Sequence, residues 1–306
     1  MKGRTWEGVW RLADPKITLA SMASIVLGAS AAAHDGPLAW GWLAATAIGI
    51  FFLEAAKNAS GELIDFASGT DQAVATEDRS PFSGGKRVLV EGLLSPAETA
   101  SVAWVGYSLG IAMGLLIVVF RAPAVLWFGV IGVALAFFYH GAPLRLSYRG
   151  LGEIAVGVCY GPLIGCGTYL VQRGRVSPEV LLLTAPLGIL VAAFLWINEF
   201  PDYQADRGAG KRTLVVRLGR ATASSAFAWL VGIAFASLLM LPLAGLPRAV
   251  WLGEAGLPFA VAAALRLRAD PDRTSRLISA QVWTLLCFLL YAVGAGAGLL
   301  LSRAYS

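Results

Sequence analysis

The chain of 306 residues is 57% hydrophobic and only 14% charged, with a formal net charge of +5 at pH 7. Because soluble domains carry about 25% charged residues, this composition excludes an ordinary soluble protein and favours one embedded in a membrane. The basic residues form no patch interleaved with aromatic residues, which argues against a nucleic-acid partner. The three cysteines, Cys159, Cys166 and Cys287, stand in apolar segments without metal-type spacing, so we expect buried thiols.

Residues 1–15 are charged and amphiphilic and lack the small-residue cleavage site of a signal peptide, so we expect this segment to lie on a membrane surface. A bilayer-spanning helix needs about 20 apolar residues, and nine such segments follow. Glu254 and Pro258 interrupt the eighth. We therefore expect an all-α fold of about nine transmembrane helices in a single domain over residues 1–306. The predicted spans are 17–33, 38–58, 97–119, 123–140, 152–171, 179–198, 222–244, 249–267 and 278–302.

The fifth predicted span carries Gly157, Gly161 and Gly165, which places one small residue on each turn of the same helix face. Rows of small residues allow membrane helices to approach closely. Pro162 stands inside this row and predicts a kink, because it cannot donate a backbone hydrogen bond. We therefore expect an irregular span in close contact with a neighbouring helix.

The distribution of basic residues predicts how the spans are oriented. Of the 24 Lys and Arg residues, 19 fall on the side of the N-terminus in this nine-span topology and 5 on the opposite side. Cytoplasmic loops carry an excess of Lys and Arg. We therefore expect a multi-pass protein of the cell membrane with a cytoplasmic N-terminus, an external C-terminus and two long cytoplasmic loops, residues 57–96 and 199–221.

A row of polar residues, Asn198, Asp202 and Asp206, recurs at every fourth position directly after the sixth apolar segment. On a helix this spacing places the three side chains on one face. Carboxylates at the end of a membrane helix are costly unless they pair or bind a cation. A basic run follows the row, and this combination is typical of a site that holds a divalent metal with a phosphorylated ligand.

A second polar row precedes the first long loop. If the second predicted helix continues into that loop, its polar residues fall on one face at spacings of four, four and three residues. They are Glu54, Asn58, Glu62 and Asp65. Gly69 would end this helix and let Asp71 fold back toward the row.

Carboxylates that converge without His or Cys select hard cations, and Mg²⁺ first among them. The metal candidates are Glu62, Asp65, Asp71, Asp202 and Asp206. Cations in the same two loops could neutralise a diphosphate; they are Arg79, Lys86, Lys211 and Arg212. The ordinary alternative is a set of solvated surface pairs of little energetic value, which we expect for Glu77, Asp78 and Arg217.

These motifs resemble those of the UbiA superfamily of intramembrane prenyltransferases. The row of Asn198, Asp202 and Asp206 matches the second motif of that family, NxxxDxxxD, in full, and residues 206–219 look like the signature that follows it. The nine predicted spans agree with the family fold, so the resemblance covers nearly the whole chain. The branch that prenylates 1,4-dihydroxy-2-naphthoate is most similar, on the strength of residues 69–71, 139–143, 148–153 and 161–162.

The first motif departs from the family pattern. The family usually begins this motif with Asn-Asp, where this chain has Gly61 and Glu62. Asn58, one turn earlier, would take the amide role, and Glu62 would act as a carboxylate with a longer reach. The resemblance assigns substrate binding to Asn58 and Asn198.

The resemblance also implies a mechanism. Mg²⁺ bridges the two acidic motifs to the diphosphate of a polyprenyl donor, the allylic C–O bond ionises, and an electron-rich aromatic ring attacks the cation. Catalytic roles fall to Asp65, Asp202 and Asp206, and Tyr139 would face the cation or orient the phosphate. The prenyl tail would lie between helices, and the candidates for its wall are Phe137, Phe138, Phe194 and Trp196.

Several alternatives remain open for the acceptor and the function. Lys16, Arg145 and Arg149 could hold the carboxylate of an aromatic acid, or they could be anchors at the cytoplasmic surface. The acceptor could be another quinone precursor or a glycerol-phosphate lipid. A non-catalytic ligand-sensing protein and a transporter are further possibilities, although a transporter predicts ionisable groups at the bilayer midplane, whereas here they cluster at one face. Nothing in the sequence indicates an oligomeric state.

Overall fold

The computed structural model describes residues 2–304, and the side chains of residues 4–303. The described residues are mainly helical and contain no β-strand, as the sequence predicts. The α-helices are α1 (Lys2–Ala13), α2 (Pro15–Asp35), α3 (Trp40–Ala67), α4 (Thr70–Ala73), α5 (Pro96–Phe120), α6 (Val125–His140), α7 (Gly152–Val158), α8 (Ile164–Arg173), α9 (Pro178–Gly208), α10 (Leu214–Leu218), α11 (Arg220–Met240), α12 (Leu257–Ala269) and α13 (Thr274–Ala304). The 3₁₀ turns are η1 (Thr76–Asp78), η2 (Leu146–Tyr148), η4 (Leu241–Ala244) and η5 (Arg248–Gly256), and η3 (Cys159–Leu163) is a π-helical turn.

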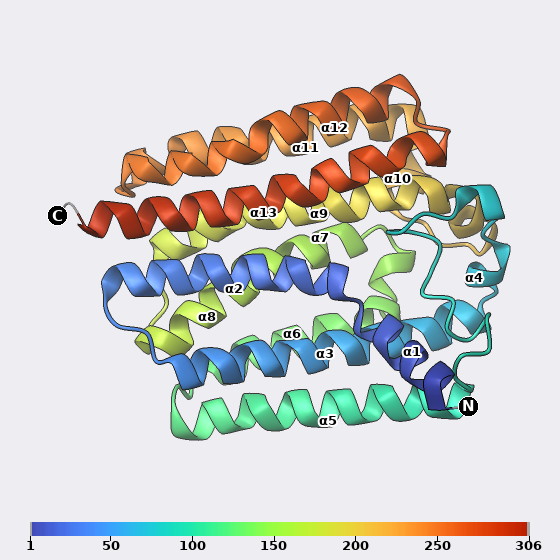
Figure 1. Ribbon diagram of the computed structural model, residues 1–306, viewed down its shortest axis with the longest axis horizontal. Coiled ribbons are helices and arrows are strands. Elements are labelled where there is room, and N and C mark those ends of the chain that lie inside the picture. Colours follow the sequence, from blue (N-terminus) through green and yellow to red (C-terminus); the bar gives the residue numbers. More distant parts are fainter. Residues whose placement is uncertain (1, 305–306) are drawn as a thin grey trace.

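The long helices run side by side in one bundle (Figure 1). Seven helical segments of the described chain are long and apolar enough to cross a membrane. The two other predicted spans are α3 and α6, of 28 and 16 residues, and both lie in the same bundle. The eighth predicted span is divided as expected, because η5 ends at Gly256 and α12 begins at Leu257. The protein is therefore a multi-pass membrane protein.

A sharp turn at Asp14 separates α1 from α2. Asp14 has a φ of 40°, and Pro15 then opens α2 with a φ suited to the first helical position. Because of this turn, α1 packs across the end of α3 instead of continuing α2 (Figure 1). Leu12 is fully buried there, whereas Trp6 and Trp10 are 70% and 58% exposed.

Close packing at the centre of the bundle joins α7, η3 and α8 to α9. A Cβ on Gly161 would lie 2.5 Å from Gly188 Cα, and a Cβ on Gly165 would lie 2.4 Å from Thr184 Cγ2. Only small residues allow this approach, which confirms the prediction from the glycine row. The π turn contains Pro162, which confirms the predicted irregularity.

Helices α3 and α9 carry the two polar rows. Both helices continue past their apolar portions and end on the same side of the bundle (Figure 1). The loops at residues 68–95 and 209–219 follow them, and α4 contacts α9 across the intervening space. This arrangement brings two segments that are more than 100 residues apart to one end of the molecule.

Candidate active site

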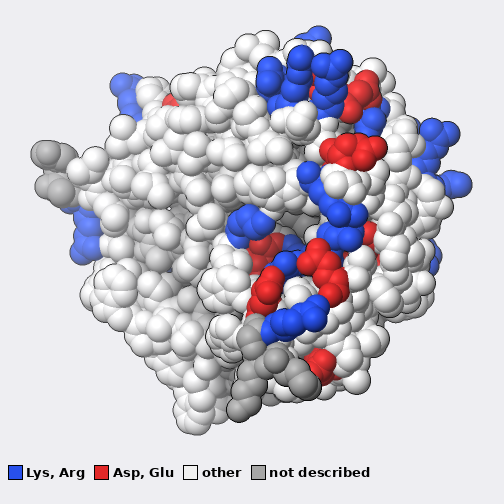
Figure 2. All heavy atoms as spheres, turned by 45° about the vertical axis from the view of Figure 1, so that its right-hand side comes forward, with Lys and Arg blue, Asp and Glu red and all other residues white. Residues whose placement is uncertain are grey.

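Charged side chains gather around a hollow at the end of the bundle, and the adjoining flank is largely uncharged (Figure 2). A polar cavity of about 140 Å³ opens there between α2, α9 and the loop that follows α4. Its charged and amide residues are Asp14, Lys16, Asn198, Glu199, Asp202, Asp206 and Lys211. The second polar row therefore faces a cavity, as the spacing predicts.

Asp65, near the end of α3, lies at a junction of four segments. Its Oδ1 accepts a hydrogen bond of 3.0 Å from the hydroxyl of Tyr148 in η2. Its Oδ2 lies 3.6 Å from His140 Nε2 at the end of α6, and 3.7 Å from Lys211 Nζ in the loop after α9. Three polar groups from distant parts of the chain thus hold this carboxylate in place.

Lys211 connects the two acidic rows. Its Nζ lies 3.5 Å from Asp206 Oδ1 on α9 and 3.7 Å from Asp65 Oδ2 on α3. Burial of this ammonium acts to lower its pKa, but the carboxylates of Asp206 and Asp65 outweigh burial and raise the pKa of Lys211 well above its ordinary value. Lys211 is therefore a permanent cation between the buried carboxylate of Asp206 and the partly buried carboxylate of Asp65.

Three α9 residues that line the polar cavity each carry a buried side-chain oxygen for which the geometry gives no hydrogen bond. These oxygens are Asn198 Oδ1, Glu199 Oε2 and Asp202 Oδ1. Buried polar atoms are nearly always paired, so this set suits a bound cation. Within the described residues, no three His, Cys, Asp or Glu side chains form a ready-made metal cluster. An oxygen-rich but open donor set fits Mg²⁺, which keeps several waters and uses few protein ligands.

Asp71 turns back toward the first row, as the sequence predicts. Gly69 follows the end of α3 with a φ of 80°, and α4 then carries Asp71 against the backbone of Gly85. A Cβ on Gly85 would lie 2.3 Å from Asp71 Oδ1, and its φ of +74° also favours glycine. Burial, with the nearby charges of Glu62 and Asp65, raises the pKa of Asp71 to about 8.

Two residues of the first row bond to the segments that cover the site. Asn58 Nδ2 donates a hydrogen bond of 3.0 Å to the Leu12 carbonyl in α1. Glu62 Oε1 accepts one of 2.9 Å from the Leu89 backbone N–H. The first row therefore helps to hold α1 and the loop in place, in addition to any role toward a ligand.

Two predicted lysines also contact the covering segments. Lys86 pairs with Asp14 at the turn between α1 and α2, and burial lowers the pKa of Lys86 to about 8. Lys16 donates to the Pro81 carbonyl, and its ammonium lies 5.5 Å from the centre of the Phe82 ring. Of these two lysines, Lys16 lines the polar cavity and Lys86 does not.

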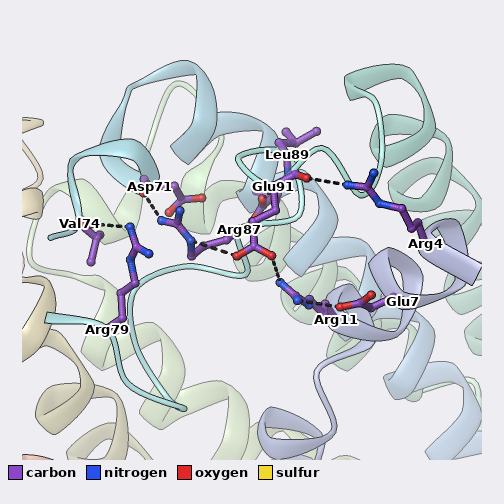
Figure 3. Close-up of polar contacts among 10 residues, drawn as sticks. Arg4, Glu7, Arg11, Asp71, Val74, Arg79, Arg87, Leu89 and Glu91 are labelled. Carbon is purple, nitrogen blue, oxygen red and sulfur yellow. Dashed lines mark hydrogen bonds and ion pairs between the residues drawn. The ribbon is translucent and has the colours of Figure 1, made fainter. Parts of the chain in front are cut away.

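A chain of ion pairs fastens this loop to α1 (Figure 3). Arg11 Nη1 lies 2.7 Å from Glu91 Oε2, and its Nη2 lies 2.7 Å from Glu7 Oε1. Arg87 Nε lies 3.3 Å from Glu91 Oε1, and Arg87 Nη1 donates 3.1 Å to the Asp71 carbonyl. These contacts hold the loop against α1 and α4.

Four predicted arginines do not line the polar cavity. Arg79 and Arg212 are exposed, and Arg79 donates to the Val74 carbonyl. Arg145 places its guanidinium 3.8 Å from the centre of the Tyr148 ring. The fourth, Arg149, is exposed and donates to a carbonyl in its own loop.

A second cavity, apolar and about 180 Å³ in volume, lies between α3, α5, α6, η3 and α8. Tyr139 lines both this cavity and the polar one, so the two cavities adjoin at this residue. The apolar walls include Ile50, Leu53, Phe128, Leu135 and Leu163. The four aromatic residues predicted for such a wall lie elsewhere: Phe194 lines the polar cavity, and Phe137, Phe138 and Trp196 line neither.

Sequence reasoning missed several residues of these cavities. Lys57 on α3 places Nζ 4.5 Å from the centre of the Tyr139 ring, and Glu199 contributes an unpaired oxygen to the polar cavity. Both are charged residues within or beside a membrane helix, and that cost is a signal that could have identified them. Asp14 and Thr213 line the polar cavity from turns, and only the folded arrangement reveals them.

The described helices form a membrane bundle with a lysine-bridged acidic site at one end, beside an apolar cavity, and a polar site next to an apolar cavity is typical of ligand-binding membrane proteins. The model of the UbiA prenyltransferase family matches residues 21–290 of the chain. The chain is also 32% identical over 293 residues to the 1,4-dihydroxy-2-naphthoate octaprenyltransferase of Mycobacterium tuberculosis, across 94% of each chain. The chain therefore belongs to the UbiA prenyltransferase family, and it is a prenyltransferase.

Solved structures share the fold. The apo structure of a UbiA homolog from Aeropyrum pernix K1 matches with a TM-score of 0.67 at 18% identity, over 93% of this chain and 97% of that one. A UbiA homolog from Archaeoglobus fulgidus, solved with GPP and Mg²⁺, matches with a TM-score of 0.64 at 15% identity, over 95% of this chain and 99% of that one.

Proposed function

We propose that the protein transfers a polyprenyl group from a polyprenyl diphosphate to an aromatic acceptor, and that 1,4-dihydroxy-2-naphthoate is the preferred acceptor. The observation that carries this proposal is Lys211, held between Asp65 and Asp206 beside the apolar cavity that begins at Tyr139. A diphosphate needs cations and a prenyl chain needs an apolar wall, and the two features adjoin here. The name of the mycobacterial relative supports the acceptor.

We propose Mg²⁺ as the metal, in keeping with the metal bound in the Archaeoglobus homologue. Asp202 and Asp206 would hold it from α9, and Asp65 and Asp71 from the opposite side. Glu62, whose Oε1 accepts a hydrogen bond from the Leu89 N–H, would use its other oxygen. When bound, Mg²⁺ neutralises the diphosphate and stabilises it as a leaving group.

The side chains of the protein would position the donor. Lys211 would pair with diphosphate oxygens, and the unpaired Asn198 oxygen would orient metal-bound water or the donor head group. The ring of Tyr139 would face the allylic cation at the mouth of the apolar cavity, where cation–π attraction stabilises it. Phe82 stacks edge-on against Phe194 over the polar cavity and would keep water from the cation.

Among the cations predicted to hold an acceptor carboxylate, we assign this role to Lys16. It lines the polar cavity, whereas Arg145 covers the Tyr148 ring and Arg149 is exposed. We propose that residues 1–306 form a single domain, and the 19-to-5 distribution of basic residues supports a catalytic end that faces the cytoplasm of the cell membrane.

The decisive experiment uses purified protein in lipid nanodiscs with Mg²⁺, polyprenyl diphosphates of two lengths and a panel of acceptors. The panel contains dihydroxynaphthoate, a different quinone precursor, a neutral phenol and a glycerol-phosphate lipid, and Asp206→Asn is the inactive control. Prenylated naphthoate product at the highest kcat/KM is the expected result. Transfer to the neutral phenol or the glycerol phosphate alone would contradict the acceptor and leave the family membership intact.

A further inference from the structure

Helix α6 lies against the apolar cavity along most of its length. The α6 residues that line the cavity recur every three or four positions, which places them on one face of the helix. They are Val125, Phe128, Gly129, Gly132, Leu135, Ala136 and Tyr139. All 16 residues of α6 are described, and among them only Tyr139 and His140 are buried. The cavity, and not a packed core, therefore adjoins most of this face.

Three glycines keep the cavity open from two sides. Gly129 on α6 and Gly114 on α5 both line it, and a Cβ added at either position would meet no neighbouring heavy atom within 4 Å. A Cβ on Gly132, one turn from Gly129, would lie 3.6 Å from Leu163 Cδ2, which is ordinary van der Waals contact. We call these three residues the open glycines. Larger side chains at these positions would extend into the cavity, because no neighbouring backbone blocks them.

Other glycines of α5 have a different reason to be small. A Cβ on Gly110 would lie 2.6 Å from Leu53 Cγ, and a Cβ on Gly106 would lie 2.9 Å from the Phe52 carbonyl oxygen. Both contacts are with α3, so these two glycines allow the helices to pack closely. Close packing does not explain the open glycines, although glycine is unfavourable inside a helix.

The open glycines of α6 follow one another with increasing distance from the candidate active site. The two cavities adjoin at Tyr139. Because a helix rises 1.5 Å per residue, Gly132 lies about 10 Å and Gly129 about 15 Å from Tyr139 along the axis of α6. A prenyl chain that starts at Tyr139 and follows α6 would therefore pass Gly132 first and Gly129 second.

We propose that Gly132 and Gly129 determine which prenyl donors the protein accepts, because the absence of side chains there leaves room for a long chain. This inference rests on the proposed prenyl transfer and extends it by naming the residues that select the donor. A large side chain at Gly132 would obstruct every donor except the shortest. The same side chain at Gly129 would obstruct the cavity farther from the reacting carbon.

The test compares Gly132→Leu and Gly129→Leu with a matched control, Gly232→Leu. Gly232 also lies inside a membrane-spanning helix, α11, where a Cβ would meet no neighbouring atom within 4 Å, but it lines neither cavity. All three variants exchange glycine for leucine in a helix, so they share any effect on helix propensity. The measurement is kcat/KM in nanodiscs for geranyl, geranylgeranyl and octaprenyl diphosphate, with the acceptor that the wild type prefers.

We expect Gly132→Leu to raise the preference for geranyl over octaprenyl diphosphate, as a ratio of kcat/KM, by about tenfold or more. The reason is that one methylene group in an apolar pocket discriminates between substrates by about 10- to 200-fold. Gly129→Leu should use geranylgeranyl diphosphate better than Gly132→Leu does, because its obstruction lies farther from Tyr139. Gly232→Leu should keep the preference of the wild type.

A compensating change at Leu163 gives an independent arm. Leu163 is the nearest neighbour of a Cβ on Gly132, so Leu163→Ala returns volume at the same level of the cavity. Combined with Gly132→Leu, it should restore part of the octaprenyl transfer, whereas a misfolded variant would not recover.

An unchanged donor preference in Gly132→Leu would overturn the proposal. Equal losses with all three donors that Leu163→Ala does not reverse would also overturn it, because they would indicate damage to the fold. Absence of prenyl transfer by the wild type with every donor would instead refute the proposed function, and this extension with it. The two failures are distinguishable, because donor preference is compared only among proteins that transfer a prenyl group.

Discussion

The Tyr148 hydroxyl donates a hydrogen bond of 3.0 Å to Asp65 Oδ1, although 83 residues separate the two in the chain. This bond joins the loop after α6 to the first acidic row. The guanidinium of Arg145 lies 3.8 Å from the centre of the Tyr148 ring, and Lys211 lies 5.8 Å from it. Tyr148 therefore connects the basic loop residues to a carboxylate of the candidate site.

Replacing Tyr148 with Phe tests this connection. The change removes one hydrogen bond to a charged group, which costs about 1.5–3 kcal/mol, so kcat/KM should fall about 10- to 100-fold while the fold is retained. Steady-state kinetics with donor and acceptor varied in turn give the measurement. Unchanged kinetics would show that Lys211 and His140 suffice to hold Asp65.

Removing the charge of Lys211 should destabilise the protein. In Lys211→Met, Asp65 and Asp206 lose their shared cation, and breaking a buried pair costs about 3–5 kcal/mol. We expect a lower midpoint of thermal unfolding in nanodiscs, with partial recovery as Mg²⁺ is added, because the metal supplies positive charge. Lys211→Arg is the matched control and should unfold near the wild-type temperature. A Met variant as stable as wild type, with or without Mg²⁺, would argue against the bridge.

The two acidic rows should act as one unit. Asp65→Asn and Asp202→Asn should each abolish most transfer, and the double variant should be little worse than either single one. Transfer rates of the four proteins under saturating Mg²⁺ give the comparison. Losses that multiply would show that the two rows contribute separately.

Removing Mg²⁺ should abolish prenyl transfer. The binding of Mg²⁺ should depend on pH, because Asp71 must lose its proton to act as a ligand. The pKa of Asp71 is about 8 in the folded protein, against an ordinary 3.8, so Asp71 keeps its proton near pH 7. Because the folded state then binds a proton that the unfolded state has lost, the stability of the metal-free protein falls as the pH rises from about 4 to 8. A metal must displace that proton. The Mg²⁺ concentration for half-maximal rate should therefore fall up to about tenfold per pH unit, and level off above pH 8.

Asp71→Asn provides the control for this pH dependence. The variant lacks the titrating proton, so its Mg²⁺ requirement should vary much less between pH 6 and 8 than that of the wild type. Full turnover of the wild type in excess EDTA would contradict the metal requirement altogether. An equally steep pH dependence in the variant would assign the proton to a different group.

Single cysteines introduced into a cysteine-free background test the orientation. Ser68 follows α3 and Ala209 follows α9, so Cys at either position should react with a membrane-impermeant reagent only from the cytoplasmic side. Ala124, exposed in the loop between α5 and α6, is the control and should react only from outside. Labelling of Ser68→Cys from outside would show that the protein has the opposite orientation to the one that the basic residues predict.

The local features of this protein could be predicted from its sequence because they depend on short-range patterns. Apolar length located the spans, the spacing of Asn198, Asp202 and Asp206 placed them on one face, and Gly69 marked the end of α3. The interruption of the eighth span also followed from a local signal, Pro258. Each of these inferences needed only residues within one or two helical turns.

The contacts between distant segments could not be predicted in this way. The position of Lys211 between the two rows depends on how the loop after α9 folds, and the bond from Asn58 to Leu12 depends on the turn at Asp14. The apolar cavity has the same origin, since it is the space left between α3, α5, α6 and α8. Composition alone favoured aromatic residues such as Trp196, which instead donates to the Ala223 carbonyl in the core.

The π turn at Cys159–Leu163 makes this part of the chain intolerant of insertions and deletions. Each residue turns the helical backbone by about 100° around the helix axis. Removing one residue from the π turn would therefore rotate α7 by about that angle relative to α8. Gly157 would then leave the face that meets Gly188, and a larger residue would take its place. Glu153, which accepts a hydrogen bond of 2.5 Å from the Leu214 N–H, would turn away from it. Among related chains we therefore expect substitutions here but a constant length.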